Sequence, residues 1–189
     1  MRYIGDVHGK MDEYLEIING CEESIQVGDF GVGFVPVPQV PNKHRFIRGN
    51  HDSPGLCRLE DNWIEDGIYD GIHLFIGGAY SIDQSSRIPG ISWWADEELG
   101  WEELNRIIDT VPVNNPRIIV SHDAPKYITN QLFPFARYAS GSRTQNALDA
   151  IFEIHKPEIW IVGHWHSSHD VVIDGTRFIF LNELEYIDL

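Results

Sequence analysis

The chain opens with Arg2-Tyr3-Ile4-Gly5-Asp6-Val7-His8-Gly9, a short β-type segment that ends at a glycine followed by polar side chains. The same pattern returns twice, because a strand-like segment over residues 24–28 ends at Gly28-Asp29 and another over residues 45–48 ends at Gly49-Asn50. In open α/β sheets, functional sites gather at the carboxyl ends of the strands. The sequence therefore predicts that these polar side chains are delivered to one edge of a sheet.

Two later segments follow the same rule. Residues 117–120 form a strand-like run that stops at Ser121-His122-Asp123, and residues 158–162 form one that stops at Gly163-His164-Trp165-His166. The other expected elements are helices over residues 11–18, 101–108 and 144–155, a strand over residues 72–76, and a hairpin of residues 171–173 and 177–181 joined through Asp174-Gly175. Strands that alternate with helices and also form a hairpin predict an α/β fold of two packed mixed sheets flanked by helices.

Length and composition predict one compact domain over residues 1–189. An apolar fraction of 42% and a charged fraction of 23% are typical of soluble globular proteins, and no apolar run approaches the length of a membrane span. The first residues lack the features of a secretory signal, so a cytoplasmic location is expected. Cys21 and Cys57 are far apart, which argues against a disulfide scaffold or a thiolate metal site and favours small buried or half-buried side chains.

A formal net charge of -15 disfavours nonspecific binding to nucleic acid, which depends on Lys and Arg side chains that neutralise phosphates. Metal ions bound by some of the acidic residues would reverse the field locally. A small phosphorylated substrate, or the end of one strand, therefore stays compatible with this charge.

The potential metal ligands all follow predicted strands. They are Asp6, His8, Asp29, Asn50, His122, His164 and His166. The spacings Asp-x-His and His-x-His point alternate side chains toward one centre. Oxygen and nitrogen ligands without thiolates favour Mn²⁺, our first choice, or Fe, Ni, Co or Zn over calcium. Seven ligands exceed the needs of one ion with an open position, so two ions that share a bridging carboxylate are predicted.

Two metal ions about 3.5–4 Å apart lower the pKa of a bridging water and offset the charge that develops during phosphoryl transfer. The reaction also needs a proton donor near the leaving oxygen, and His51 follows the potential ligand Asn50 directly. The residues therefore indicate an enzyme that hydrolyses phosphate esters with a metal-activated hydroxide.

The order of these motifs resembles the calcineurin-like metallophosphoesterases, over residues 5–166. The matching segments are Gly5-Asp6-Val7-His8-Gly9, Gly28-Asp29, Gly49-Asn50-His51-Asp52, His122 and Gly163-His164-Trp165-His166. This resemblance implies a four-layer αββα sandwich with a dinuclear metal centre. It assigns Asp6, His8 and His166 to one metal, Asn50, His122 and His164 to the other, and Asp29 to a position between them. It makes His51 the catalytic histidine, which protonates the leaving group or steadies the transition state.

Two further positions of the motif carry expectations. Arg48 resembles the arginine that precedes this motif in phage and eukaryotic protein phosphatases, and is therefore a candidate phosphate contact among the catalytic residues. Asp52, also counted with the catalytic residues, is either a partner of the site or a turn residue.

One departure from the family pattern bears on the substrate. Many members carry a second aspartate three residues after the bridging one, where it orients the catalytic histidine, and this position holds Val32. The protein Ser/Thr phosphatase subgroup is therefore disfavoured, and the group that orients His51 stays open.

Residues 77–100 are expected to be mostly loop, and they resemble a stretch in small bacterial and phage members of the family. Candidate substrate contacts are Arg87, which could clamp a phosphate oxygen, Trp94, which could stack on a base, and Arg143. The ordinary alternatives are packing for the tryptophan and solvent for the arginines. The acidic run Asp96-Glu97-Glu98 is expected to begin a helix, where the helix dipole favours negative charge.

The sequence thus favours a phosphomonoesterase or phosphodiesterase that acts on a small or nucleotide-like phosphate. The alternatives are a Ser/Thr protein phosphatase of the phage type, a nuclease, and a scaffold that has kept the fold without catalysis. A scaffold would have lost ligands, and none of the seven is lost. The natural substrate and the oligomeric state stay open.

Overall fold

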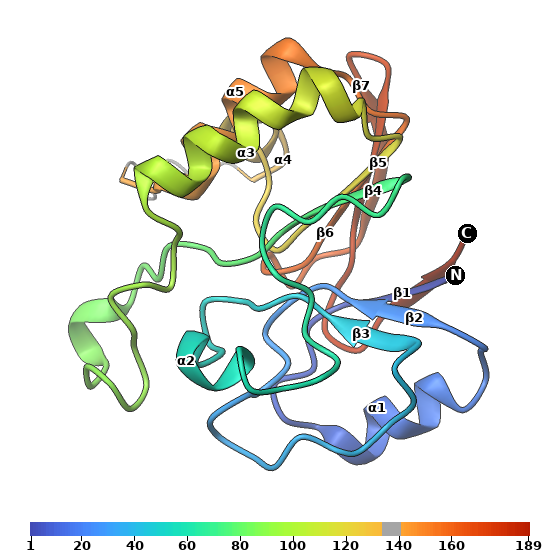
Figure 1. Ribbon diagram of the computed structural model, residues 1–189, viewed down its shortest axis with the longest axis vertical. Helices are drawn as coiled ribbons and strands as arrows, with labels where there is room; N and C mark the ends of the chain where they lie inside the picture. Colours follow the sequence, from blue (N-terminus) through green and yellow to red (C-terminus); the bar gives the residue numbers. More distant parts are fainter. Residues whose placement is uncertain (134–140) are drawn as a thin grey trace.

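The structure is a computed structural model that describes residues 1–133 and 141–189. Its strands form two sheets, one of four strands in the order β3-β2-β1-β9 and one of five strands in the order β4-β5-β6-β8-β7 (Figure 1). The strands are β1 (Arg2–Ile4), β2 (Ser24–Gln26), β3 (His44–Phe46), β4 (His73–Ile76), β5 (Ile118–Ser121), β6 (Ile159–Val162), β7 (His169–Ile173), β8 (Thr176–Phe180) and β9 (Tyr186–Asp188). Both sheets are mixed, because β9 runs antiparallel to β1 and β7 runs antiparallel to β8.

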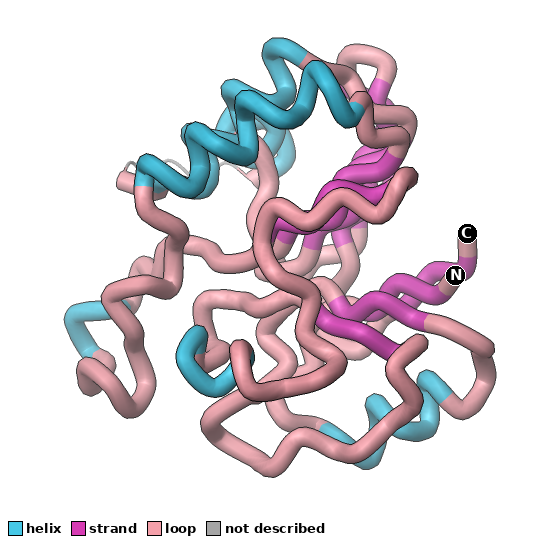
Figure 2. The backbone as a smooth tube through the Cα atoms, viewed as in Figure 1, coloured by secondary structure: helices cyan, strands magenta, loops and turns pink. Residues whose placement is uncertain are grey.

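Helices cover the outer face of each sheet. They are α1 (Met11–Ile18), α2 (Pro54–Cys57), α3 (Trp101–Asn114), α4 (Lys126–Leu132) and α5 (Arg143–Ile154), with a short 3-10 turn η1 (Gln84–Ser86). Helix α1 lies on the four-stranded sheet, and α3, α4 and α5 lie on the five-stranded sheet (Figures 1 and 2). The predicted layer order, helix, sheet, sheet, helix, is confirmed.

Alternation along the strands builds the two sides of the core. On β6, Trp160 packs toward the helices α3, α4 and α5, whereas its neighbour Ile161 packs between the sheets. On β1, Tyr3 packs between the sheets and Ile4 packs toward α1. Successive side chains of a strand point to opposite faces, so each sheet buries both of its faces.

Two expectations about helix α3 are wrong. The helical spacing of Trp101, Leu104 and Ile108 predicts that they share one apolar face, but the buried residues of the helix are Leu104, Ile107 and Val111, and Trp101 is 51% exposed. The helix also begins after the acidic run. Glu97 and Glu98 are buried and accept hydrogen bonds from other segments, so they do not serve as its first turn.

The chain ends with a hairpin and an edge strand. Strands β7 and β8 are joined through Asp174 and Gly175, both at positive φ, and this hairpin confirms the prediction. Strand β9 was not predicted. It pairs with β1, where the Arg2 guanidinium donates to the Asp188 carboxylate at 2.8 and 2.7 Å. None of the helices in the described residues has the length and apolar character that crossing a membrane requires.

Candidate metal centre

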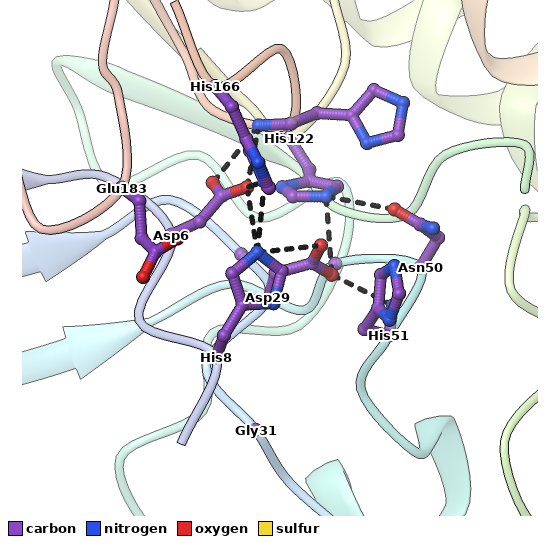
Figure 3. A network of polar contacts seen from close by, with 12 residues as sticks. Asp6, His8, Asp29, Gly31, Asn50, His51, His122, His166 and Glu183 are labelled. Carbon is purple, nitrogen blue, oxygen red and sulfur yellow. Dashed lines mark hydrogen bonds and ion pairs between the residues drawn. The ribbon is translucent and has the colours of Figure 1, made fainter. Parts of the chain in front are cut away.

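The carboxyl ends of five strands from both sheets supply the polar cluster of Figure 3. The residues that follow these strands are Asp6 after β1, Asp29 after β2, Asn50 after β3, His122 after β5 and His164 after β6. Strands β1, β2 and β3 are parallel to one another, as are β5 and β6, so their ends lie at shared edges. The structure thus brings together side chains that are as distant in sequence as those of Asp6 and His166.

The cluster contains two groups whose ligand atoms lie within 4.8 Å of one another: Asp6 with His8 and His166, and Asp29 with His122 and His164. In the first group, His166 Nε2 lies 3.0 Å from Asp6 Oδ2 and 2.9 Å from His8 Nε2. Two imidazole nitrogens that face each other at this distance need a proton or a cation between them, because their lone pairs otherwise repel. The first group is therefore suited to hold a cation.

Asp29 faces both groups. Its Oδ1 lies 3.4 Å from His122 Nε2, and its Oδ2 lies 4.0 Å from His8 Nε2. The residue has a φ of 54°, in the left-handed region that Asp tolerates better than most residues, and its Oδ1 also accepts a hydrogen bond from the His51 backbone N–H at 2.8 Å. A carboxylate in this position can join two cation sites.

Asn50 adds an amide oxygen to the second group. Its Oδ1 lies 3.1 Å from His122 Nε2, and the residue is buried. The other ring nitrogen of His122, Nδ1, donates to the Val27 carbonyl oxygen at 2.8 Å, which leaves Nε2 as the atom that faces the cluster. Such a bond fixes the ring of a ligand histidine and its tautomer.

The buried carboxylates of the cluster form no ion pair with a Lys or Arg side chain among the described residues. Asp6 and Asp29 are buried, and within the described residues their ion-pair partners are histidines rather than Lys or Arg. Burial opposes the charge on His122, but Asp29 and Asp6 overcome it and raise the pKa of His122 to about 10. Burial likewise opposes the charge on Asp29, and His122 with the other histidines holds the pKa of that carboxyl well below its usual range. In the absence of metal, a proton on His122 thus balances part of the buried negative charge, and divalent cations suit these oxygen and nitrogen donors.

Two glycines of the sequence motifs allow the ligands to approach the backbone. A Cβ at Gly49 would overlap the Asp29 carboxylate, and a Cβ at Gly163 would overlap Asp6 Oδ1. The next residue after Gly163 uses this closeness, because the His164 N–H donates to Asp6 Oδ1 at 3.0 Å. Glycine is required at these positions by close contact.

Arg87 occupies the neighbourhood of His51. Its Nη2 lies 2.7 Å from His51 Nε2 and its Nη1 lies 3.1 Å from His51 Nδ1, while its Nε pairs with Asp83 at 2.8 Å. Burial lowers the pKa of His51, and the nearby guanidinium lowers it further, although Asp29 opposes both. Val32 is buried in the apolar cluster against α1. The partner that His51 has in this structure is therefore a cation, where the family pattern has an aspartate.

Asp52 holds together the loops that carry the candidate ligands Asp29 and Asn50. Its two carboxylate oxygens accept backbone N–H groups at 2.7–3.0 Å from Phe30, Gly31, Val32 and Gly49. These bonds join the loop of Asp29 to the turn of Asn50. The geometry agrees with a partner of the site, and the catalytic role expected for Asp52 has no supporting contact.

Three other predicted residues contact the protein away from the ligands. The Arg48 guanidinium is buried, pairs with Asp66 at 2.8 Å and donates to the Glu97 carbonyl oxygen at 2.7 Å, so its expected contact with phosphate has no support in this geometry. Arg143 donates to the carbonyl oxygens of Leu99 and Glu98 at 3.3 and 3.4 Å. Trp94 packs edge-on against Phe34, with 5.7 Å between the ring centroids. Of the candidate substrate contacts, Arg87 is the one that touches a residue of the cluster.

No role in the site was predicted from the sequence for several residues that lie near the cluster. Trp165 donates from Nε1 to Asp123 Oδ1 at 3.0 Å and stacks on Phe133 at 4.5 Å, which holds the turn in which His164 and His166 have positive φ. Ser81 and Glu97 lie in the irregular segment before α3, where the Ser81 hydroxyl accepts from Asn50 and donates to Glu97. Trp165 and Asp123 stand inside quoted motifs, whereas Ser81 and Glu97 have no local signal.

A comparison with protein families matches residues 3–168 to the calcineurin-like phosphoesterases. This range contains all seven candidate ligands and, apart from Arg2 at the start of β1, the strands and helices from β1 to β6. A comparison with curated proteins found no significant match.

Proposed function

The chain belongs to the calcineurin-like phosphoesterase family, and from this premise we propose that it hydrolyses phosphate mono- or diesters of small or nucleotide-like compounds at a centre of two divalent metal ions. The observation that carries the proposal is the position of the Asp29 carboxylate, which has one oxygen toward His122 and the other toward His8. Membership of the family supports metal-dependent hydrolysis of phosphate esters in general. The substrate, the number of metals and their identity are the proposed part.

The ligands divide into two sets that share Asp29. Asp6, His8 and His166 would hold one ion, and Asn50, His122 and His164 would hold the other. When bound, two such ions supply positive charge for the phosphoryl oxygens and lower the pKa of a water. Mn²⁺ is the first choice, with Fe, Ni, Co or Zn as alternatives, because each accepts a mixture of imidazole, carboxylate and amide ligands.

His51 and Arg87 would act on the substrate from the protein side. Their contact at 2.7 Å places a guanidinium and an imidazole next to each other beside Asp29. A phosphoryl group that enters there offers the guanidinium a better partner than the imidazole, because charge-assisted bonds are stronger than bonds to a neutral ring. We propose that Arg87 then binds a phosphoryl oxygen and that His51, relieved of the adjacent positive charge, holds the proton for the leaving oxygen.

An aromatic pair favours substrates that carry a ring. Phe34 is 50% exposed and packs with Trp94, and Arg87 reaches the same segment through a hydrogen bond from Nη1 to the Ser92 carbonyl oxygen at 3.4 Å. Exposed aromatic faces stack on nucleobases with little dependence on sequence.

The contact of Arg143 with substrate stays a prediction, as do the single domain over residues 1–189, the cytoplasmic location and the absence of nonspecific nucleic-acid binding.

The test compares substrate classes under the candidate metals. Protein stripped with chelator and supplied with Mn²⁺ should hydrolyse p-nitrophenyl phosphate, bis(p-nitrophenyl) phosphate or a nucleotide, and the rates with each define the branch. A phosphopeptide panel and DNA substrates report on the protein phosphatase and nuclease alternatives. If no ester is cleaved with any of the five metals, the proposed function is wrong and the scaffold alternative takes its place.

A variant pair locates the substrate side of the site. Arg87→Ala should lower kcat/KM by about 10–100-fold, the size of a lost hydrogen bond to a charged group, without a change in Mn²⁺ affinity. Arg106→Ala removes the same charge from an exposed position on α3 and should leave kcat/KM unchanged. Equal values of kcat/KM for the two variants would show that Arg87 does not bind the substrate.

A further inference from the structure

The amide of Asn50 has two ends, and only one of them can bind a cation. Its carbonyl oxygen is an acceptor and its NH₂ group is a donor, so a rotation of 180° would replace a ligand by a group that repels the metal. In the structure, Oδ1 lies 3.1 Å from His122 Nε2 and points into the cluster (Figure 3). The NH₂ group points away and donates from Nδ2 to Ser81 Oγ at 3.0 Å.

Ser81 can accept this bond because its own proton is directed elsewhere. Its hydroxyl donates to Glu97 Oε2 at 2.5 Å, and its backbone N–H donates to Glu97 Oε1 at 2.9 Å. A carboxylate only accepts hydrogen bonds, so the single hydroxyl proton of Ser81 faces Glu97 and its lone pairs face Asn50. Only the NH₂ end of the amide fits against those lone pairs.

From this direction of donors we propose that Glu97 and Ser81 are positioning residues that turn the carbonyl oxygen of Asn50 toward the cation held with His122 and His164. The inference rests on the proposed metal centre and deepens it. Ser81 and Glu97 are 2% and 3% exposed, so water does not compete for these bonds.

Arg48 holds the backbone of the segment that carries Glu97. Its guanidinium donates to the Glu97 carbonyl oxygen and pairs with Asp66, whose Oδ1 in turn accepts the N–H of Gly77. The arginine thus ties the segment of Glu97 to β3, whose end carries Asn50. This role accounts for a buried arginine beside the Gly49-Asn50 motif without any contact with phosphate.

The variant Glu97→Gln tests the direction of the hydrogen bonds that run from Asn50 through Ser81 to Glu97. It leaves the size and shape of the side chain at position 97 almost unchanged. The Ser81 backbone N–H still needs an acceptor, so the glutamine must place its oxygen there and its NH₂ group against the Ser81 hydroxyl. The hydroxyl proton then faces Asn50 and favours the rotated amide. We expect the cation site of Asn50, His122 and His164 to bind Mn²⁺ about 10–100-fold more weakly, the effect typical of lost support behind a ligand, while the site of Asp6, His8 and His166 keeps its affinity.

Calorimetric titration of chelator-stripped protein with Mn²⁺ measures both sites, and three controls accompany it. Asp96→Asn removes a neighbouring exposed charge and should leave both affinities unchanged. Ser81→Ala should weaken the same site as Glu97→Gln, and Ser81→Thr, which keeps the hydroxyl, should restore it. Far-UV circular dichroism and thermal unfolding confirm that each variant is folded, and Ser81→Ala stands in if Glu97→Gln is not.

A double variant separates positioning from a general structural effect. Because Glu97 acts through Asn50, Glu97→Gln should have no further effect on Mn²⁺ binding in an Asn50→Ala background. Two tight sites in folded Glu97→Gln, or an equal loss with and without Asn50, would overturn the inference and leave the proposed function intact. A wild-type protein that binds no Mn²⁺ would instead overturn the proposed function and this inference with it.

Discussion

The two halves of the proposed metal centre differ in how far the protein encloses their imidazoles. The outer half comprises Asp6, His8 and His166, and the inner half comprises Asp29, Asn50, His122 and His164. The difference lies in the outer imidazoles, because the side chains of His166 and His8 are 47% and 23% exposed, whereas those of Asp6, Asp29 and His122 are at most 2% exposed. The inner half is therefore oriented by bonds to the protein, and the outer imidazoles contact mainly each other and the carboxylates.

This difference shows how one cluster combines two properties. In the inner half, His122 and Asn50 are oriented by bonds to the protein, from His122 to the Val27 carbonyl oxygen and from Asn50 to Ser81. The outer imidazoles of His8 and His166 are open to solvent, although Asp6 between them and the protein interior is buried. Enclosure has an energetic consequence, because buried carboxylates without a cation depend on a protonated His122.

The largest effect on turnover should come from Asp29, the inner residue whose other carboxylate oxygen faces His8 of the outer half. Asp29→Asn should lower kcat by about 100–1,000-fold, the range for loss of one electrostatic group of an active site, and should weaken both Mn²⁺ sites. Asparagine tolerates the positive φ of this position, so the backbone should keep its shape. Steady-state kinetics with saturating Mn²⁺ measures the effect, and Asp12→Asn on the exposed face of α1 is the control. Turnover that is unchanged in Asp29→Asn would show that the two halves do not share this carboxylate.

The second prediction compares the two halves by how much one histidine of each contributes to the free energy of unfolding. In chelated protein at neutral pH, His122→Ala leaves the buried Asp29 carboxylate without its ion-pair partner and should lower the free energy of unfolding by about 3–5 kcal/mol. His166→Ala acts at a half-exposed position and should lower it by less than about 1 kcal/mol. Urea unfolding of both variants gives the two values. Equal losses would mean that enclosure does not distinguish the halves.

The third and smallest effect is a dependence of Mn²⁺ binding on pH. The pKa of His122 is raised to about 10, so the imidazole is protonated at pH 7 and must release its proton before Nε2 can bind a cation. The affinity of the inner half should therefore increase by about tenfold per pH unit as the pH rises toward that pKa. Calorimetry in buffers of different ionisation enthalpy should detect about one proton released per inner Mn²⁺ at pH 8. A binding step without proton release would contradict the protonated state of His122.

The convergence of the candidate ligands was predictable because its signals are local. Each ligand follows a glycine or a strand end within two or three residues, and the glycines at 49 and 163 are required by contact with Asp29 and Asp6. The apolar patterns over residues 158–162 and 144–155 likewise predicted strand β6 and helix α5. These features depend on residues that are close together in sequence, so sequence patterns can predict them.

The supporting residues were not predictable, because their partners are distant in sequence. Glu97 contacts Ser81 from 16 residues away, and Arg48 contacts Glu97 from 49 residues away. The position of Arg48 before Gly49 suggested phosphate, whereas its side chain turns to Asp66 inside the protein. Strand β9 was missed for a related reason, since its pattern of exposure lacks a buried face and its pairing with β1 spans almost the whole chain.

Metal content tests the central claim most directly. Chelator-stripped protein that is equilibrated with excess Mn²⁺ and then freed of unbound metal should retain about two equivalents per chain, and Asp29→Asn should retain fewer. One equivalent or none in the wild-type protein would contradict a centre in which Asp29 joins two cations.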